Sequence, residues 1–130
     1  MPSSAAVKER NDDAVFAALK RLLEPYEKGN RVVHNTPDYY YIETVEPINR
    51  GNPLFLAAVK RGKAYVSFHL MALYGSPELV ASVSPELKRR MQGKSCFNFK
   101  TVDEKLFAEL AKLTKRGIPG LIRHVSNKAL

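Results

Sequence analysis

The 130-residue chain has one cysteine and no long apolar run, and both features exclude classes of protein. Cys96 cannot form an internal disulfide and belongs to no C-x-x-C pair for zinc or redox chemistry. The longest apolar stretches, 54–59 and 66–73, are far shorter than the roughly 20 residues of a membrane-spanning helix. Residues 1–10 lack the basic start and apolar core of a signal peptide. We therefore expect a cytoplasmic protein with no membrane partner.

The sequence also lacks the common catalytic and cofactor motifs. It contains no Walker loop, no G-x-G-x-x-G, no H-E-x-x-H and no G-x-S-x-G. Its histidines, His34, His69 and His124, are far apart along the chain. These absences favour a non-catalytic binding or accessory domain without a cofactor or a metal site, and they leave enzyme activity unsupported rather than excluded.

The composition is that of one globular domain. The apolar fraction is 45% and the charged fraction 26%, both close to the averages of globular chains, and a chain of this length buries one core. The formal net charge of +8 favours anionic partners, because net charge acts on association rather than on the fold. We expect a flexible tail over residues 1–10 and a single domain over 11–130.

Helical and strand patterns follow one another along the chain and predict an α+β fold. A helix is expected from residues 11–13 to about Lys28, with Pro25 ending it early. β-branched and aromatic residues predict strands over 31–34 and 39–45, with a turn at 36–38. The expected architecture is an N-terminal helix and C-terminal helices packed on an antiparallel β-sheet.

Residues 54–71 have the pattern of a β-hairpin. A two-residue Arg61-Gly62 turn, with Gly62 at positive φ, would pair Val59 with Ala64 and Phe55 with Phe68. One face of this hairpin is then apolar, and it consists of Phe55, Ala57, Val59, Val66 and Phe68. The other face is mixed, so we expect it to be partly covered; it consists of Leu54, Leu56, Ala58, Tyr65, Ser67 and His69.

Two Ser-Pro-Glu-Leu segments follow, and each predicts a short helix capped by its serine, Ser76 or Ser84. The second helix is expected to continue to Gly93 and to precede a strand over 95–99. Thr101 and Glu104 have the spacing of a capping box. The helix that they open is expected to end within 117–120, before a short terminal helix from 121.

Several of these segments resemble the YdhG-like family of domains of unknown function. The resemblance rests on Tyr-Val-Ser-Phe-His (65–69), the Ser-Pro-Glu-Leu pair, Gly-Lys-Ser-Cys-Phe-Asn-Phe (93–99) and a closing Leu-Phe-Ala-Glu-Leu helix, and covers roughly residues 12–117. It implies a small α+β domain. Some members are described as frataxin-like iron chaperones, so it also implies iron handling as an alternative function.

The sequence departs from that alternative in its charges. Iron ions prefer clustered carboxylate oxygens. Here the candidate carboxylates lie on two separate helices, in a chain whose basic excess repels cations; they are Asp12, Asp13, Glu104 and Glu109.

Polar side chains alternate along two of the predicted strands and indicate a site on the mixed sheet face. If these strands are neighbours, the side chains form a pocket for an unknown small ligand or a contact with a protein, including a second copy of the chain. The predicted ligand-binding residues are Tyr41, Tyr65, Ser67, His69, Cys96 and Asn98. Two alternatives stay open: the polar groups satisfy one another without a ligand, or Cys96 and His69 form a reactive thiolate pair.

A basic stretch provides a second candidate site. Phosphate groups are bound by side chains of this kind, and nucleic-acid binding is therefore an alternative function. The chain lacks the RRM aromatic signature and a GXXG loop, and a solvated helix end also explains such a stretch. The predicted anion-binding residues are Lys88, Arg89, Arg90, Lys94 and Lys100.

Overall fold

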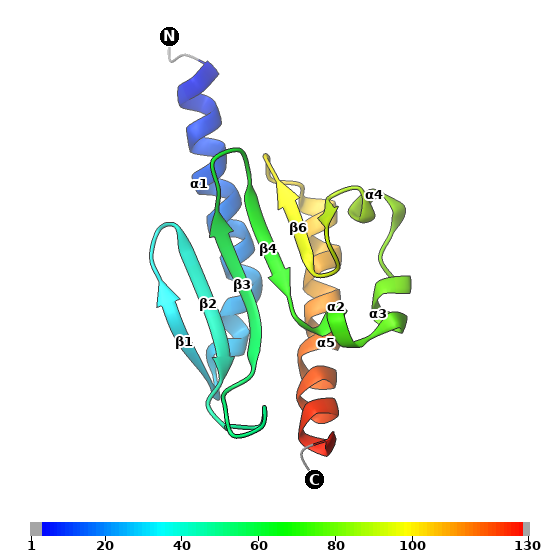
Figure 1. Cartoon of the computed structure of the whole chain (residues 1–130). Coiled ribbons are helices and arrows are strands. Elements are labelled where there is room, and N and C mark those ends of the chain that lie inside the picture. The colour runs from blue at the N-terminus through cyan, green and yellow to red at the C-terminus, as the bar shows by residue number, and fades with distance from the viewer. Residues whose placement is uncertain (1–3, 129–130) are drawn as a thin grey trace.

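Two long helices pack against one face of a six-stranded antiparallel sheet, which confirms the predicted α+β class (Figure 1). The computed structural model describes residues 4–128, and side chains from Asp12 onward. The helical segments are α1 (Ser4–Leu23), the 3₁₀ turn η1 (Glu24–Glu27), α2 (Ala72–Gly75), α3 (Pro77–Ala81), α4 (Pro85–Lys88) and α5 (Glu104–Lys128). The strands, in the spatial order β1-β2-β3-β4-β6-β5, are β1 (Asn30–Asn35), β2 (Tyr39–Thr44), β3 (Phe55–Arg61), β4 (Val66–Leu70), β6 (Cys96–Phe99) and β5 (Met91–Gln92).

The core lies between the sheet and the two long helices. Strand side chains alternate between the two faces, and one phase of β2, β4 and β6 is fully buried, including Tyr40, Phe68 and Phe97. The helices contribute apolar stripes at helical spacing, which are Val15, Phe16, Leu19 and Leu23 in α1 and Leu106, Phe107, Leu110 and Leu113 in α5. Burial of these side chains is the main stabilising term of the fold.

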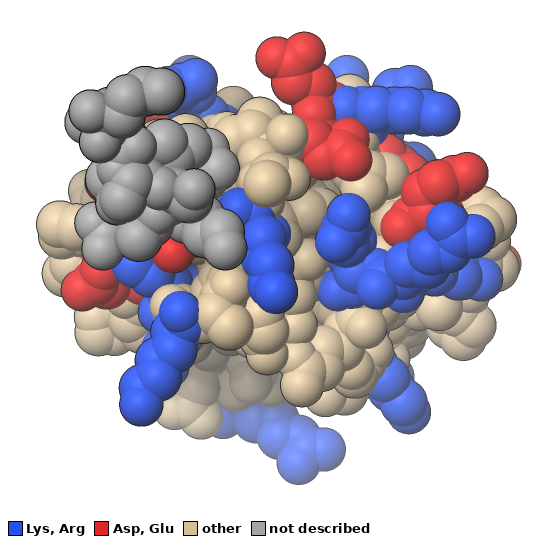
Figure 2. Space-filling view, turned by 90° about the horizontal axis from the view of Figure 1, so that it is seen from above, with Lys and Arg blue, Asp and Glu red and all other residues tan. Residues whose placement is uncertain are grey.

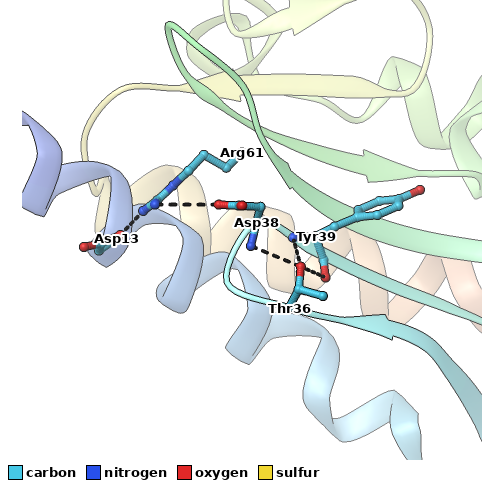
Figure 3. A network of polar contacts seen from close by, with 5 residues as sticks. All are labelled: Asp13, Thr36, Asp38, Tyr39 and Arg61. Atoms are coloured by element: carbon cyan, nitrogen blue, oxygen red, sulfur yellow. Dashed lines mark hydrogen bonds and ion pairs between the residues drawn. The ribbon is translucent and has the colours of Figure 1, made fainter.

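An arginine at the end of β3 joins the sheet to α1 (Figure 3). The Arg61 guanidinium pairs with Asp13 of α1 and lies 3.9 Å from the carboxylate of Asp38, in the turn between β1 and β2. The hydroxyl of Thr36 accepts hydrogen bonds from the backbone N–H groups of Asp38 and Tyr39 in the same turn. The turn predicted at 36–38 is therefore confirmed, and it is held against the helix.

The β3–β4 hairpin has a different register from the predicted one. Its loop is the four-residue segment 62–65, closed by a hydrogen bond from Gly62 N–H to the Tyr65 carbonyl, and Gly62 is not among the residues with positive φ. Val59 consequently pairs with Phe68, not with Ala64. Each residue of β3 pairs with a residue four positions further along the chain than predicted. Because this shift is even, every residue of β4 keeps its predicted face.

A β-bulge between β2 and β3 changes the faces of three residues, Leu54, Phe55 and Leu56. Leu54 was predicted on the mixed face and instead lies buried in the core. The register shifts between the pairs Ile42–Ala57 and Glu43–Phe55, which leaves Leu56 as the extra residue. Leu56 is fully buried, although its predicted place was the mixed face. Phe55 was predicted on the apolar face, and instead its ring packs on Tyr41 on the opposite face.

Four predicted helix boundaries require correction. Helix α1 begins at Ser4, so residues 4–10 of the predicted tail belong to it, and residues 1–3 lie outside the described part. Helix α4 ends at Lys88, and the residues before Gly93 form β5. The side chain of Asp103, not Thr101, caps α5, because its carboxylate accepts the Leu106 N–H at 3.0 Å.

The fourth correction concerns α5, which continues without interruption through Pro119 to Lys128. Proline removes one hydrogen bond from a helix interior. The buried residues Gly117 and Ile118 hold the helix before Pro119, and the partly buried Leu121 and Ile122 pack against the core after it. By contrast, the predicted caps are confirmed: Ser76 and Ser84 accept the N–H groups of Leu79 and Leu87, each at 3.1 Å.

The two glycines of α5 have opposite surroundings and provide a test of this packing. A Cβ atom on Gly117 would lie 2.9 Å from the Cβ of Ala72 and 3.1 Å from Leu79, whereas one on Gly120 would meet no atom within 4 Å. We predict that Gly117→Ala lowers the free energy of unfolding by about 1–2 kcal/mol through overpacking. Gly120→Ala should raise it by about 0.5–1 kcal/mol, because alanine favours the helix. Urea denaturation of both variants measures these changes, and a stabilised Gly117→Ala would contradict the close contact between α2 and α5.

Candidate binding site

One face of the sheet is left open by the described helices (Figure 1). The strand register and the hydrogen bonds place the predicted ligand-binding residues on this face. The strand register places one residue of each strand side by side across this open face, in the order His34, Tyr41, Ala58, His69, Cys96 and Gln92. Tyr41, His69 and Cys96 are half-buried by their neighbours on the sheet, whereas His34 and Gln92, near its two edges, are exposed. The predicted partial cover is therefore not found within the described part of the chain.

Four polar side chains form a connected network on the β4–β6–β5 side of the open face. The Ser67 hydroxyl donates to Asn98 Oδ1 at 2.7 Å, and Asn98 Nδ2 donates to Gln92 Oε1 at 2.6 Å. The Tyr65 hydroxyl donates to the same Gln92 oxygen at 3.1 Å. Three predicted residues are thus brought together, and two of them, Tyr65 and Asn98, share Gln92 as their acceptor.

Two more predicted residues, His69 and Cys96, lie beside this network as a cross-strand pair. The Cys96 sulfur lies 2.7 Å from Nδ1 of His69 and 3.7 Å from its Nε2. Burial raises the pKa of the Cys96 thiol. Burial and the nearby charge of Lys60 lower the pKa of His69. Both shifts favour the neutral forms, so the contact supports a hydrogen-bonded thiol and imidazole rather than a thiolate–imidazolium pair.

The reactivity of Cys96 tests this assignment. Because the raised pKa lowers the fraction of thiolate, we predict that iodoacetamide alkylates Cys96 more slowly in the folded protein than in urea at the same neutral pH. The rate is measured by mass spectrometry of timed samples. Faster alkylation of the folded protein would contradict the neutral pair and would restore the thiolate interpretation.

The sixth predicted residue, Tyr41, belongs to an aromatic cluster on the β1–β3 side of the open face. Its ring centroid lies 4.7 Å from that of Phe55 and 5.8 Å from that of His34. His34 in turn stacks on Tyr39 at 4.7 Å. Between Tyr41 and His69 stands only the methyl group of Ala58, so Tyr41 is separated from the polar network.

Basic side chains and the polar network meet at a hollow beside β6. This basic hollow has a volume of about 340 Å³ and is lined by Arg89, Arg90, Lys100, Tyr65, Gln92, Asn98 and Met91. The hairpin formed by β5 and β6 and the turn after α4 bring these residues together. Three predicted anion-binding residues therefore share one hollow with two predicted ligand-binding residues. Lys88 does not line it, and Lys94 lines a separate apolar hollow with Tyr74 and Val80.

Sequence reasoning missed Gln92, on which the network centres. The predicted helix up to Gly93 hid the two-residue strand that contains Gln92. Gly93 has a φ of 73°, a backbone conformation that glycine adopts without strain, and it closes the turn that pairs Gln92 with Cys96. A glycine followed by an alternating strand was the available signal for this hairpin.

Charge is distributed unevenly over the surface. In the view from above, lysine and arginine side chains spread over the whole end of the molecule, whereas acidic ones lie mainly in the upper half of the view (Figure 2). The lining of the basic hollow includes no acidic side chain. Of the ion pairs found in the described chain, none involves Arg89, Arg90 or Lys100. Arg89 and Arg90 also line a second hollow with Glu86 and Asp103, but neither forms an ion pair there in the described chain, so both can contact an anion from solution.

Two of the four carboxylates considered for iron have other partners. Asp13 pairs with Arg61, and the Glu109 carboxylate accepts hydrogen bonds from the N–H and hydroxyl groups of Ser84. Within the described residues, no three histidine, cysteine or acidic side chains are grouped so that they would hold a metal ion. None of the helices in residues 4–128 has the length and apolar character that a membrane crossing requires.

Comparison of the chain with family models, with curated proteins and with solved structures finds no match.

Proposed function

We propose that this chain is a non-catalytic binding domain that takes a phosphate-bearing ligand in the basic hollow. The observation that carries the proposal is the convergence of Arg89, Arg90 and Lys100 on a hollow that has no acidic lining residue. Guanidinium and ammonium groups bind phosphate through charge-assisted hydrogen bonds, which are the stronger class of hydrogen bond. The Tyr65 hydroxyl and one N–H of Asn98 already donate to Gln92 Oε1. The neutral donors left at the wall of the same hollow are the amide N–H groups of Gln92 and the second N–H of Asn98.

Neutral groups at the wall support binding rather than catalysis. Amides are not nucleophiles, and the lining contains no acidic side chain or histidine that would activate the Tyr65 phenol as one. His69 and Cys96 lie outside the lining of the hollow. Directional donors of this kind orient a ligand, whereas the flexible cations contribute most of the attraction. A cytoplasmic location is part of the proposal.

Membership of the YdhG-like family also remains a proposal. The motifs that suggest it, residues 65–69 and 93–99, form β4, the β5–β6 turn and β6, which surround the binding site. Because that family is one of unknown function, membership names no ligand. The iron-handling alternative receives no support from the described carboxylates. Asp13 pairs with Arg61 and Glu109 with Ser84, and no three metal-binding side chains are grouped among the described residues.

Pyrophosphate is a suitable probe of the basic hollow. We predict that it raises the melting temperature of the protein, since a ligand that binds only the native state stabilises it. The double variant Arg89→Gln/Arg90→Gln should lose this shift and weaken the affinity at least about tenfold, because each hydrogen bond to a charged group contributes about 1.5–3 kcal/mol. Thermal-shift titration and calorimetry measure both effects.

The matched control is Arg21→Gln/Arg123→Gln, which removes the same charge from exposed positions in α1 and α5. These arginines do not line the basic hollow, so the control should retain the response to pyrophosphate. Equal loss in both double variants would show that net charge alone attracts the anion, and would refute the site.

A further inference from the structure

The aromatic cluster on the open face takes no part in the proposed phosphate site. His34, Tyr39, Tyr41 and Phe55 come from three neighbouring strands, and successive ring centroids lie 4.7–5.9 Å apart. A sheet face left to solvent normally carries polar side chains in these positions. A continuous aromatic surface on an uncovered face indicates an interaction site.

A lysine lies between the aromatic cluster and the basic hollow. The ammonium group of Lys60 stands 5.5 Å from the ring centroid of Tyr39, and Lys60 is exposed. The register places Tyr39, Lys60, Ser67 and Asn98 in one row across the open face. The row leads from an aromatic ring, past a free cation, to the wall of the hollow.

The length of this row limits what can occupy it. Three strand spacings of about 4.8 Å separate Tyr39 from Asn98, which gives about 14 Å. A nucleoside monophosphate is too short to place its base on the aromatic cluster and its phosphate in the hollow. A chain that alternates aromatic bases with phosphates matches the sequence of groups along the row. Glu43, the acidic residue beside Phe55, is paired with Arg31 at 3.7 Å, which reduces its repulsion of such a chain.

From these observations we infer that the open face binds a single-stranded nucleic acid. Its bases stack at Phe55 and at Tyr39, where a base takes the ring position over which the Lys60 ammonium now stands, opposite the stacked His34. The displaced Lys60 then contacts a phosphate, and further phosphates occupy the basic hollow. Base stacking on aromatic side chains requires unpaired bases, so a duplex does not fit this flat face. The inference rests on the proposed function for its phosphate contacts, and the aromatic cluster adds the recognition of bases.

The test is fluorescence anisotropy with a labelled single-stranded DNA of about eight nucleotides, within the usual site size of such surfaces. Tyr39→Leu/Phe55→Leu removes a ring at each end of the aromatic cluster and should weaken binding roughly tenfold or more. Tyr74→Leu is the matched control and should leave the affinity unchanged, because this exposed tyrosine of α2 belongs neither to the aromatic cluster nor to the lining of the basic hollow. A thermal melt confirms that each variant is folded.

Pyrophosphate separates this inference from the proposed function. If Tyr39→Leu/Phe55→Leu loses DNA binding and keeps its thermal shift with pyrophosphate, both hold. If pyrophosphate binds but the single-stranded DNA binds no more tightly than pyrophosphate does, the inference is wrong and the phosphate site stands. The same holds if a DNA duplex displaces the labelled single strand as well as an unlabelled single strand does. If the protein is a dimer that the same double variant dissociates, a second copy occupies the open face, and the inference is again wrong. Failure of pyrophosphate in the wild type refutes the proposed function itself.

Discussion

One-sided burial of the sheet is the constraint on which the rest of the structure depends. Strand side chains alternate between faces, and α1 and α5 cover only the face that carries residues such as Phe68 and Phe97. Because the apolar core forms on that face, the residues that point to the opposite face are not needed for it. They include aromatic rings, amides, a thiol and an imidazole. The residue types on the open face are consequently not constrained by packing of the core.

The open face is organised into two regions, separated by the small side chain of Ala58. One is an aromatic cluster and the other a polar network that ends at the basic hollow. The cations at the hollow lie in the turn after α4 and just beyond β6, where no described acid pairs with them. Their placement at the edge of a rigid sheet fixes the approximate position of an anion while leaving the long side chains free to adapt.

Much of this arrangement follows from sequence patterns, and the exceptions have physical causes. Alternation along β4 and β6 predicts that Ser67, His69, Cys96 and Asn98 share a face, and this survives the wrong hairpin register because an even shift preserves faces. The bulge that turns Phe55 outward is a property of two paired strands, and one strand alone carries no sign of it. The hollow depends on a two-residue strand, β5, which the longer helical pattern before Gly93 concealed. Helix α5 runs through Pro119 because tertiary packing outweighs the local preference to end there.

The central claim is that the open face, and not the helical face, is the binding surface. The most direct test is amide NMR of the isotope-labelled protein, titrated first with pyrophosphate and then with a single-stranded oligonucleotide. Pyrophosphate should shift resonances of β5, β6 and the turn after α4, and the oligonucleotide should extend these changes to β2, β3 and β4. Shifts confined to α1 and α5, with the strands unaffected, would contradict the account.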